Sequence, residues 1–284
     1  MSRRAVLAGA LMAAACASGR ARAAEPQRIA VLDWALAELA LALGLRPVAV
    51  AEMALYDRRV GEPSLAPGTI DLGLRSQPSL ERLASIRPDL ILALSGYGPS
   101  EARLRKIAPT LALEIYGTRR HPLDLSREAL HAIAAATGRE AMERDVIDRF
   151  DRTMAAIRER LRSKSHRPIL IPNFVDERHA DVYGFGSLFD AVLTRLGLTN
   201  AYSGPTNPWG FATIGLSEIA AYPDARLLVV SPGVPAGLAD SALWHSLPSV
   251  RAGRVSILPP VWQFGALLSA ERFAVAVGKA LAPS

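Results

Sequence analysis

Apolar runs of strand length alternate with amphipathic helical segments along this chain, and one such pairing occurs twice. Residues 81–97 read ERLASIRPDLILALSGY, and residues 218–231 read EIAAYPDARLLVVS. Each phrase is a short amphipathic helix, a Pro-Asp break that stops the helix, and an apolar run. The runs Leu90–Leu94 and Leu227–Val230 indicate strands buried on both faces. Two such units predict two α/β lobes with a ligand held between them.

The other segments follow the same alternation. Apolar strands are expected at 29–32, 47–51 and 111–115, and helices at 34–43, 79–86, 101–107 and 125–137. Residues 53–70 contain two glycines and two prolines, so we expect an irregular stretch there. A second α/β half opens at Pro168–Pro172 and contains the segments 181–183, 188–196, 218–222, 226–231 and 255–258.

Residues 139–163 differ from the rest because they contain neither glycine nor proline across about seven helical turns. Their apolar positions recur every three or four residues and form one stripe: Met142, Val146, Phe150, Met154, Ile157 and Leu161. A helix of this length would span about 40 Å. We expect it to join an N-terminal α/β lobe (24–138) to a C-terminal α/β lobe (164–284). The alternative is an ordinary long surface helix.

The first 23 residues are typical of an export signal. Arg3 and Arg4 precede the apolar stretch Ala5–Ala17, and Ala21-Arg22-Ala23 supplies a small-x-small cleavage site. The apolar stretch is shorter than the ~20 residues that cross a bilayer. Ser2-Arg3-Arg4 resembles a twin-arginine signal, although Val6 stands where the strongest form of that motif has phenylalanine. We therefore expect cleavage near Ala23 and a periplasmic location.

Removal of this signal changes both the charge and the thiol content. The full chain carries a net charge of +6, whereas the part after residue 23 has 29 basic and 27 acidic residues, net +2. No basic stripe remains, so a nucleic-acid partner is not expected. The only cysteine, Cys16, lies in the signal, so the mature chain has no disulfide or thiolate metal site. Lipidation of Cys16 stays an alternative, although the usual upstream leucine is missing.

Motifs for catalysis and for metal binding are missing from the sequence. The histidines at 121, 131, 166, 179 and 245 do not fall in HxxxH or HExxH spacing. Leu94-Ser95-Gly96 lacks the first glycine of a Gly-x-Ser-x-Gly elbow, and neither GxGxxG nor GxxxxGK occurs. We therefore predict no catalytic residue and no metal held by protein ligands. A secreted hydrolase that uses Ser95 or a carboxylate is the remaining enzymatic alternative.

Aromatic residues in glycine- and proline-rich loops are the candidate binding groups. Trp209 lies in GPTNPWG, Trp262 in PPVWQFG, and Tyr97 follows a predicted strand end, where open α/β sheets bind ligands. Tyr56 lies in the irregular stretch, and Arg75 follows another predicted strand. Planar rings bind a bulky, mostly apolar ligand at low entropic cost, and one arginine adds directed donors. Such a set predicts a large ligand with a few polar contacts.

Several phrases resemble one known family. DLGLRSQPSLERLASIRPDLI, SGYGPSEARLRKIAP, SLFDAVLTRLGLTNAY, NPWGFATI and PVWQFGALLSAERF are similar to phrases of the ferric hydroxamate-binding proteins of bacterial iron-uptake ABC transporters. The resemblance extends from Arg28 to Lys279. It implies two α/β lobes joined by one long helix, as in class III periplasmic binding proteins, with a shallow ligand cleft between the lobes.

The resemblance also implies roles for individual residues. Arg75 would donate hydrogen bonds to the hydroxamate oxygens around iron, beside Tyr97, and Trp209 and Trp262 would line the other side. Asn207 belongs to the same TNxWG phrase as Trp209. Three hydroxamates fill the coordination sphere of Fe³⁺ and neutralise it, so no cofactor and no protein metal ligand is expected.

Two positions depart from the family pattern. Arg59 stands where the family commonly has tryptophan, and Phe264 replaces the expected tyrosine, which removes one hydroxyl. Arg59 would face either an anionic group on the siderophore or solvent. These departures affect the expected selectivity more than the expected ligand class.

Delivery to a transporter is the last implication. Glu101 and Glu218 match the positions at which this superfamily contacts arginines of the inner-membrane ABC permease, although glutamate is also common in a first helical turn. We expect a monomer that captures a ferric hydroxamate siderophore and delivers it to that permease. Cobalamin, haem or a ferric catecholate as ligand, and a receptor role in signalling, remain alternatives.

Overall fold

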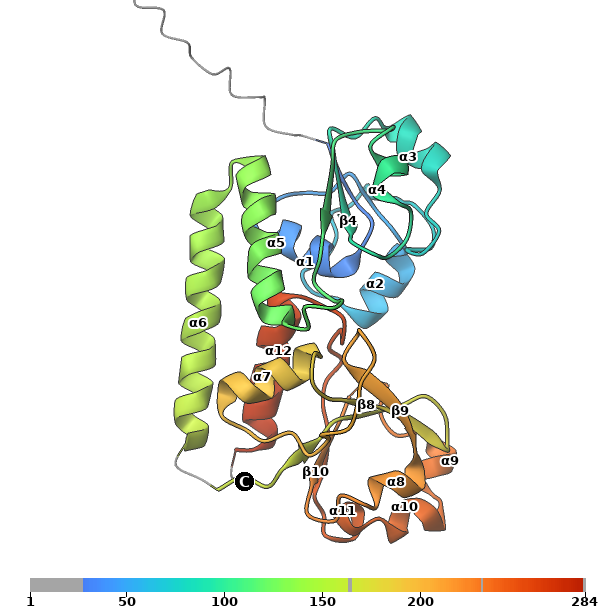
Figure 1. The fold of residues 1–284 in the computed structure, drawn as a ribbon, viewed down its shortest axis with the longest axis vertical. Helices are drawn as coiled ribbons and strands as arrows, with labels where there is room; N and C mark the ends of the chain where they lie inside the picture. The colour runs from blue at the N-terminus through green and yellow to red at the C-terminus, as the bar shows by residue number, and fades with distance from the viewer. Residues whose placement is uncertain (1–27, 163–164, 231, 283–284) are drawn as a thin grey trace, which may run out of the picture.

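A computed structural model describes residues 28–162, 165–230 and 232–282. Two α/β lobes are stacked along the long axis of the molecule, and one long helix runs beside both (Figure 1). This arrangement confirms the expected fold class. The expected export signal at 1–23, with Arg3, Arg4 and Cys16, lies outside the described residues.

The N-terminal lobe contains a five-stranded parallel sheet in the order β3-β2-β1-β4-β5. Its strands are β1 (Ile29–Val31), β2 (Ala49–Val50), β3 (Ile70–Asp71), β4 (Leu90–Leu94) and β5 (Thr110–Leu113). All five residues of β4 are buried, as its apolar run predicts for a central strand covered on both faces. The strand order reverses between β1 and β4, the place where open α/β sheets bind ligands.

Four short helices connect these strands: α1 (Trp34–Ala42), α2 (Met53–Arg59), α3 (Leu80–Ile86) and α4 (Glu101–Leu104). Helix α2 corrects the expectation of an irregular stretch over 53–70, which holds only after residue 59. Its sequence, MALYDRR, consists mainly of good helix formers, and the breakers begin at Gly61. The turn signals of Gly61 and Pro63 therefore apply to the end of the segment and not to its start.

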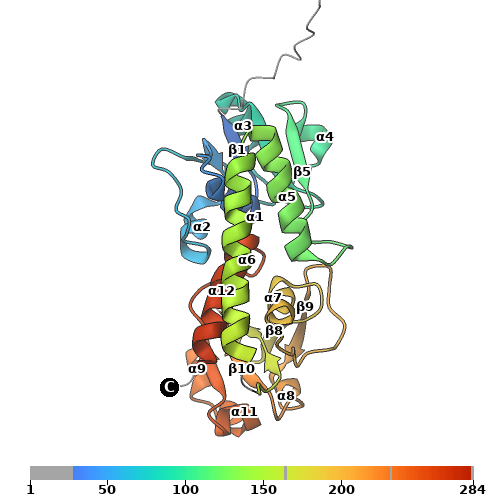
Figure 2. The same cartoon turned by 90° about the vertical axis from the view of Figure 1, so that its left-hand side faces the viewer.

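The lobes are connected by a helical hairpin of α5 (Pro122–Thr137) and α6 (Glu140–Arg162). Helix α6 has 23 residues and passes both lobes along one face of the molecule (Figure 2). Its buried side chains are Val146, Phe150, Met154, Ile157 and Leu161, five of the six positions in the predicted stripe. Met142, the sixth, is exposed.

The C-terminal lobe contains two three-stranded sheets, β11-β10-β6 (parallel) and β7-β8-β9 (antiparallel). Their strands are β6 (Ile169–Leu170), β7 (Pro172–Phe174), β8 (His179–Tyr183), β9 (Phe211–Gly215), β10 (Arg226–Val229) and β11 (Val255–Ile257). Only Ile171 separates β6 from β7, so one extended segment contributes to both sheets. The helices are α7 (Leu188–Leu196), α8 (Leu216–Ile219), α9 (Ala236–Ala239), α10 (Ala242–Ser246) and α11 (Pro248–Arg251).

The last helix, α12 (Leu267–Ala280), packs against α6 and α7 and also against α1 and α5. Glu38 on α1 is fully buried, and it accepts hydrogen bonds from the Ala266 backbone N–H (3.2 Å) and the Ser269 hydroxyl (2.6 Å). Arg272 forms an ion pair with the same carboxylate. Burial raises the pKa of Glu38, and the charge of Arg272 opposes that shift.

The C-terminal segment therefore joins the lobes a second time, in addition to α6. One hydrophobic core continues from β1 and α1 of the first lobe to α7 and α12, including Phe189 and Phe273. A shared core and a buried charge network both resist independent movement of the lobes. In the described part of the chain, no helix has the length and hydropathy needed to cross a membrane.

Candidate functional site

Four polar side chains follow the carboxyl ends of neighbouring strands in the N-terminal sheet. Asp33 follows β1, Glu52 follows β2, Arg75 follows β3 and Tyr97 follows β4. The carboxyl ends of parallel strands meet at one edge of a sheet, so these four residues, which are far apart in the sequence, lie close together there.

Arg75 lies at the centre of this group. Its Nε is 3.0 Å from Oε2 of Glu52, and its Nη1 is 3.3 Å from Oδ2 of Asp33. The guanidinium carbon lies 3.8 Å from the centre of the Trp34 ring, 5.0 Å from Trp262 and 5.9 Å from Tyr97. An arginine attracted by ring faces and held by two carboxylates has a defined orientation before any ligand arrives.

The two carboxylates are themselves held by the backbone. Asp33 caps α1 by accepting a hydrogen bond from the Ala35 N–H at 2.9 Å. Burial is the main cause that raises the pKa of Asp33, and Arg75 opposes it. Glu52 has φ of 57°, a left-handed conformation that is strained for a non-glycine residue. Its N–H donates to Gly73 O (2.7 Å) and to Oδ1 of Asp71 (3.1 Å), which hold that conformation.

Aromatic rings from the C-terminal half form a second wall. The centroid of the Trp209 ring lies 5.1 Å from Phe264 and 5.5 Å from Tyr116, and Phe264 lies 5.4 Å from Trp262. Trp262 in turn packs on Trp34 at 4.7 Å. These rings form one continuous aromatic cluster beside the guanidinium of Arg75.

The two walls touch each other in this structure. The ring centroids of Tyr97 and Trp209 are 5.8 Å apart in an edge-to-face contact, and both side chains are half-buried. The hydroxyl of Tyr116 donates to Gly265 O at 2.6 Å, which links the loop after β5 to the start of α12. The Trp262 indole N–H is buried and has no hydrogen-bond partner among the described residues.

The turn before Trp209 sets the position of its ring. Oδ1 of Asn207 accepts hydrogen bonds from the N–H groups of Trp209 (2.9 Å) and Phe211 (3.3 Å). Gly210 has φ of 83°, and a Cβ at this position would lie 2.1 Å from the Ser187 nitrogen. The loop can therefore pack this closely only with glycine after Trp209.

The structure brings together five of the predicted binding residues, namely Arg75, Tyr97, Trp209, Trp262 and Phe264. Asn207 supports the backbone of the Trp209 loop. Two others lie elsewhere. Tyr56 is fully buried, donates to Pro63 O at 2.6 Å and packs on Trp34, so it does not face a ligand in this conformation. Arg59 is exposed at the end of α2. Burial raises the pKa of Tyr183 in the C-terminal lobe, and the charge of Arg59 opposes that shift only slightly.

Sequence reasoning missed Asp33, Trp34, Glu52 and Tyr116. The first three follow directly after the predicted strands 29–32 and 47–51, so the strand-end argument that singled out Tyr97 applies equally to them. Tyr116 gave no comparable signal, because its position depends on a contact with Gly265, 149 residues further along the chain.

Comparison with known proteins identifies the family of this chain. Residues 29–261 match the family model described as periplasmic binding protein. The chain belongs to the periplasmic binding protein family.

Several proteins that the chain is similar to are named for the iron complexes that they bind. The chain is 35% identical over 260 residues to the iron(3+)-hydroxamate-binding protein FhuD of Escherichia coli K12, covering 90% of this chain and 87% of that protein. It is 27% identical to the Fe(3+) dicitrate-binding periplasmic protein FecB of the same organism, covering 88% and 83%. Among solved structures, Vibrio cholerae FhuD bound to Fe³⁺-Desferal matches with a TM-score of 0.81 and 29% identity, covering 90% and 97%.

The two candidate docking residues of this binding protein are both exposed. Glu101 opens α4 and forms an ion pair with Arg105 at 2.5 Å. Glu218 accepts a hydrogen bond from the Gly215 N–H at 2.8 Å and so caps α8. Each has a local structural role, and each leaves its side chain accessible from outside; docking stays a prediction.

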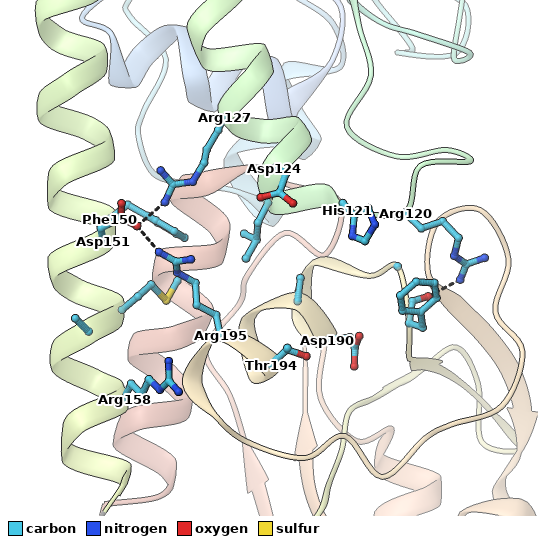
Figure 3. A pocket seen from close by; sticks show the side chains of 16 residues that line it. Arg120, His121, Asp124, Arg127, Phe150, Asp151, Arg158, Asp190, Thr194 and Arg195 are labelled. Atoms are coloured by element: carbon cyan, nitrogen blue, oxygen red, sulfur yellow. Dashed lines mark hydrogen bonds and ion pairs between the residues drawn. The ribbon is translucent and has the colours of Figure 1, made fainter.

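A groove of about 640 Å³ lies apart from the aromatic cluster, among α5, α6 and α7 of the binding protein (Figure 3). At its α6 end, Asp151 is bonded by Arg127 of α5 and by Arg195 of α7. At its other end lie Arg120 and Phe185. Among the described residues, no group of three or more His, Cys, Asp or Glu side chains is arranged to hold a metal ion.

Proposed function

We propose that this protein is an exported binding protein that captures ferric hydroxamate siderophores and delivers them to an inner-membrane ABC importer. The iron enters as part of its siderophore complex, so it is cargo and not a cofactor. The similarity to FhuD of E. coli and to the Fe³⁺-Desferal-bound FhuD of V. cholerae supports this ligand class. The protein binds its cargo without transforming it.

The observation that carries the proposal is the setting of Arg75. Glu52 and Asp33 already balance the positive charge of Arg75. Their two hydrogen bonds use only part of the guanidinium, so its other N–H groups can donate to a ligand. Such a site favours a ligand with acceptor oxygens and little net negative charge. A ferric tris-hydroxamate core is neutral, whereas a ferric tris-catecholate of charge −3 would be repelled by the two carboxylates.

The aromatic wall suits the outer surface of such a complex. Trp209 and Phe264 are half-buried and offer apolar faces to the carbon chains linking the hydroxamates, whereas Trp262 is buried and supports them. Because Tyr97 and Trp209 touch in this structure, a ligand seated between them requires these rings to separate. Helix α6 and the Glu38 network limit that movement to a small displacement of the loops and lobes.

Export and delivery complete the proposed cycle. Residues 1–23 direct the chain to the periplasm, where the mature protein acts as a monomer. Glu101 and Glu218 lie on different lobes, on α4 and α8, so a permease that binds both carboxylates would contact both lobes at once. Pulling the lobes apart there would separate the walls of the site and release the complex.

Intrinsic tryptophan fluorescence of the protein without residues 1–23 tests this proposal. We expect saturable quenching by ferrichrome or ferrioxamine B, none by the iron-free siderophores, and a large loss of affinity in Arg75→Ala. Arg103→Ala is the matched control, since Arg103 is an exposed arginine on α4 of the same lobe. Quenching by cobalamin, haem or a ferric catecholate in place of the hydroxamates would overturn the ligand class.

A further inference from the structure

Arg120 occupies an unusual position between β5 and α5. It has φ of 56°, one of the left-handed non-glycine conformations in the described chain, which costs backbone strain. Its side chain leaves the N-terminal lobe and reaches two loops of the C-terminal lobe (Figure 3). There it donates to Phe185 O, to Thr206 O (3.2 Å) and to the Thr206 hydroxyl.

These contacts differ from those of an ordinary ion pair. The partners of Arg120 are neutral oxygens, and no carboxylate pairs with it among the described residues. Its guanidinium also lies 5.0 Å from the ring of Phe185. The two loops pack very close to it, because a Cβ at Gly186 would lie 2.8 Å from its Nε. Arg120 is therefore a specific hydrogen-bonding bridge between the lobes.

The two loops lead directly to Trp209. The Thr206 hydroxyl donates to Phe185 O at 2.7 Å, so Arg120 and Thr206 together tie the loops to each other. The N–H of Gly184 donates to Gly210 O at 3.0 Å, next to Trp209. Asn207, the residue after Thr206, holds the backbone of Trp209. Hydrogen bonds, together with the peptide links Thr206–Asn207 and Gly184–Phe185, thus connect Arg120 to the backbone on both sides of the Trp209 ring, which meets Tyr97.

We propose that Arg120 is a positioning residue that latches the Trp209 loop to the N-terminal lobe. The latch sets the spacing between Trp209 on one lobe and Tyr97 on the other. A change in lobe separation is then transmitted to the aromatic wall through Thr206 and Asn207. The effect of the latch on siderophore affinity rests on the proposed function, whereas its effect on Trp209 does not.

A second bridge across the same groove provides a matched control. Arg127 and Arg195 both bond to Asp151 at the α6 end of the groove, between helices and not between loops. Their side chains are 26% and 42% exposed, so this bridge resembles a surface ion pair, which contributes little to stability. Arg127→Ala removes one arginine from the groove and leaves the Trp209 loop intact.

¹⁹F NMR of the ligand-free protein labelled with 5-fluorotryptophan tests the latch. Trp209→Phe assigns the Trp209 resonance among the four tryptophans of the chain. We expect Arg120→Ala to shift or broaden this resonance, Thr206→Val to do so to a smaller extent, and Arg127→Ala to leave it unchanged. Trp244, packed on Phe174 in a separate core of the C-terminal lobe, serves as an internal reference.

Calorimetric titration with ferrioxamine B follows in the same variants. Loss of the hydrogen bonds should weaken binding about 3- to 10-fold in Arg120→Ala. An unchanged Trp209 resonance in both Arg120→Ala and Thr206→Val overturns the latch, even if affinity falls. If Arg120→Ala fails to fold, the Trp209 resonance of Arg120→Lys and Thr206→Val tests the latch in its place. If the unaltered protein binds no siderophore, the proposed function fails, while the ligand-free spectra still decide the latch.

Discussion

The two walls of the site are built in different ways. The N-terminal wall presents Asp33, Glu52, Arg75 and Tyr97 from the short segments that follow four strands of one parallel sheet. The C-terminal wall presents Trp209, Trp262 and Phe264 from loops, held by an Asn207 turn and by close packing at Gly210. Directed polar contacts thus come from one edge of a sheet, and broad apolar contacts come from loops of the other half of the chain.

This difference indicates a division of labour. A guanidinium must lie within hydrogen-bond distance of particular oxygens, and small displacements remove the bond. An aromatic face accepts a range of ligand positions because dispersion and apolar burial are not directional. We expect the sheet edge to select the chelating groups and the loops to accommodate variation in the rest of the siderophore.

We expect the largest effect, on stability, from the buried Glu38 network that connects the two lobes. Glu38→Ala removes the buried carboxylate that holds α12 against α1 and leaves Arg272 without its partner. The free energy of unfolding should fall by about 3–5 kcal/mol in urea denaturation, because an uncompensated charge is left partly buried. Glu128→Ala, which breaks an exposed ion pair with Arg119, is the control and should change the free energy of unfolding far less. Equal losses in both variants would contradict a structural role for Glu38.

Within the polar wall, Arg75→Ala should have the largest effect on binding. It removes charge-assisted donors and leaves Asp33 buried without its cation, so affinity for a ferric hydroxamate should fall about 100-fold. Calorimetry on the variant and on Arg103→Ala measures the loss. A loss below about 3-fold would show that Arg75 does not contact the ligand.

In the aromatic wall, Trp209→Ala should weaken binding about 10-fold, since one large ring contact is lost and no charge is stranded. The loss should be similar for ferrichrome and ferrioxamine B if the wall lacks directional selectivity. Trp209→Phe, which keeps an aromatic face, should recover most of the affinity. A loss of affinity for only one of the two siderophores would contradict the proposed division of roles between the walls.

We expect the smallest effect on affinity from Asn207, which supports the turn before Trp209. Asn207→Ala removes the oxygen that accepts from two backbone N–H groups, so the Trp209 turn should loosen and affinity should fall about 3-fold. Asn207→Asp keeps the acceptor oxygen and should remain close to the unaltered protein. Equal affinities for Ala and Asp variants, both reduced, would instead indicate that the amide NH₂ group touches the ligand.

Much of the architecture could be predicted from local pattern. The stripe of α6, the Pro-Asp phrases before β4 and β10, and the segment that forms α7 are local signals, and the structure contains them at the expected positions. Helix α2 differs from the expected irregular stretch because the glycines and prolines lie only after residue 59, beyond the end of the helix.

Less of the site could be predicted from the sequence. Arg75 and Tyr97 could be identified from their positions after strands, but the carboxylates that hold Arg75 required knowledge of strand order. The β3-β2-β1-β4-β5 order places residues 33, 52 and 75 side by side, and no local pattern specifies that order. The same holds for Tyr116 and Arg120, whose partners lie in the other half of the chain.

Binding of two ligands of different charge to this one site tests most directly whether Arg75 and its two carboxylates select a neutral iron complex. Calorimetry should be run on the protein without residues 1–23, with ferrioxamine B and with a ferric tris-catecholate of charge −3. We expect saturable binding of ferrioxamine B at one complex per protein, strongly weakened in Arg75→Ala. We expect no measurable binding of the catecholate, because Asp33 and Glu52 already balance the charge of Arg75. Tighter binding of the catecholate than of ferrioxamine B would contradict this selection of a neutral complex.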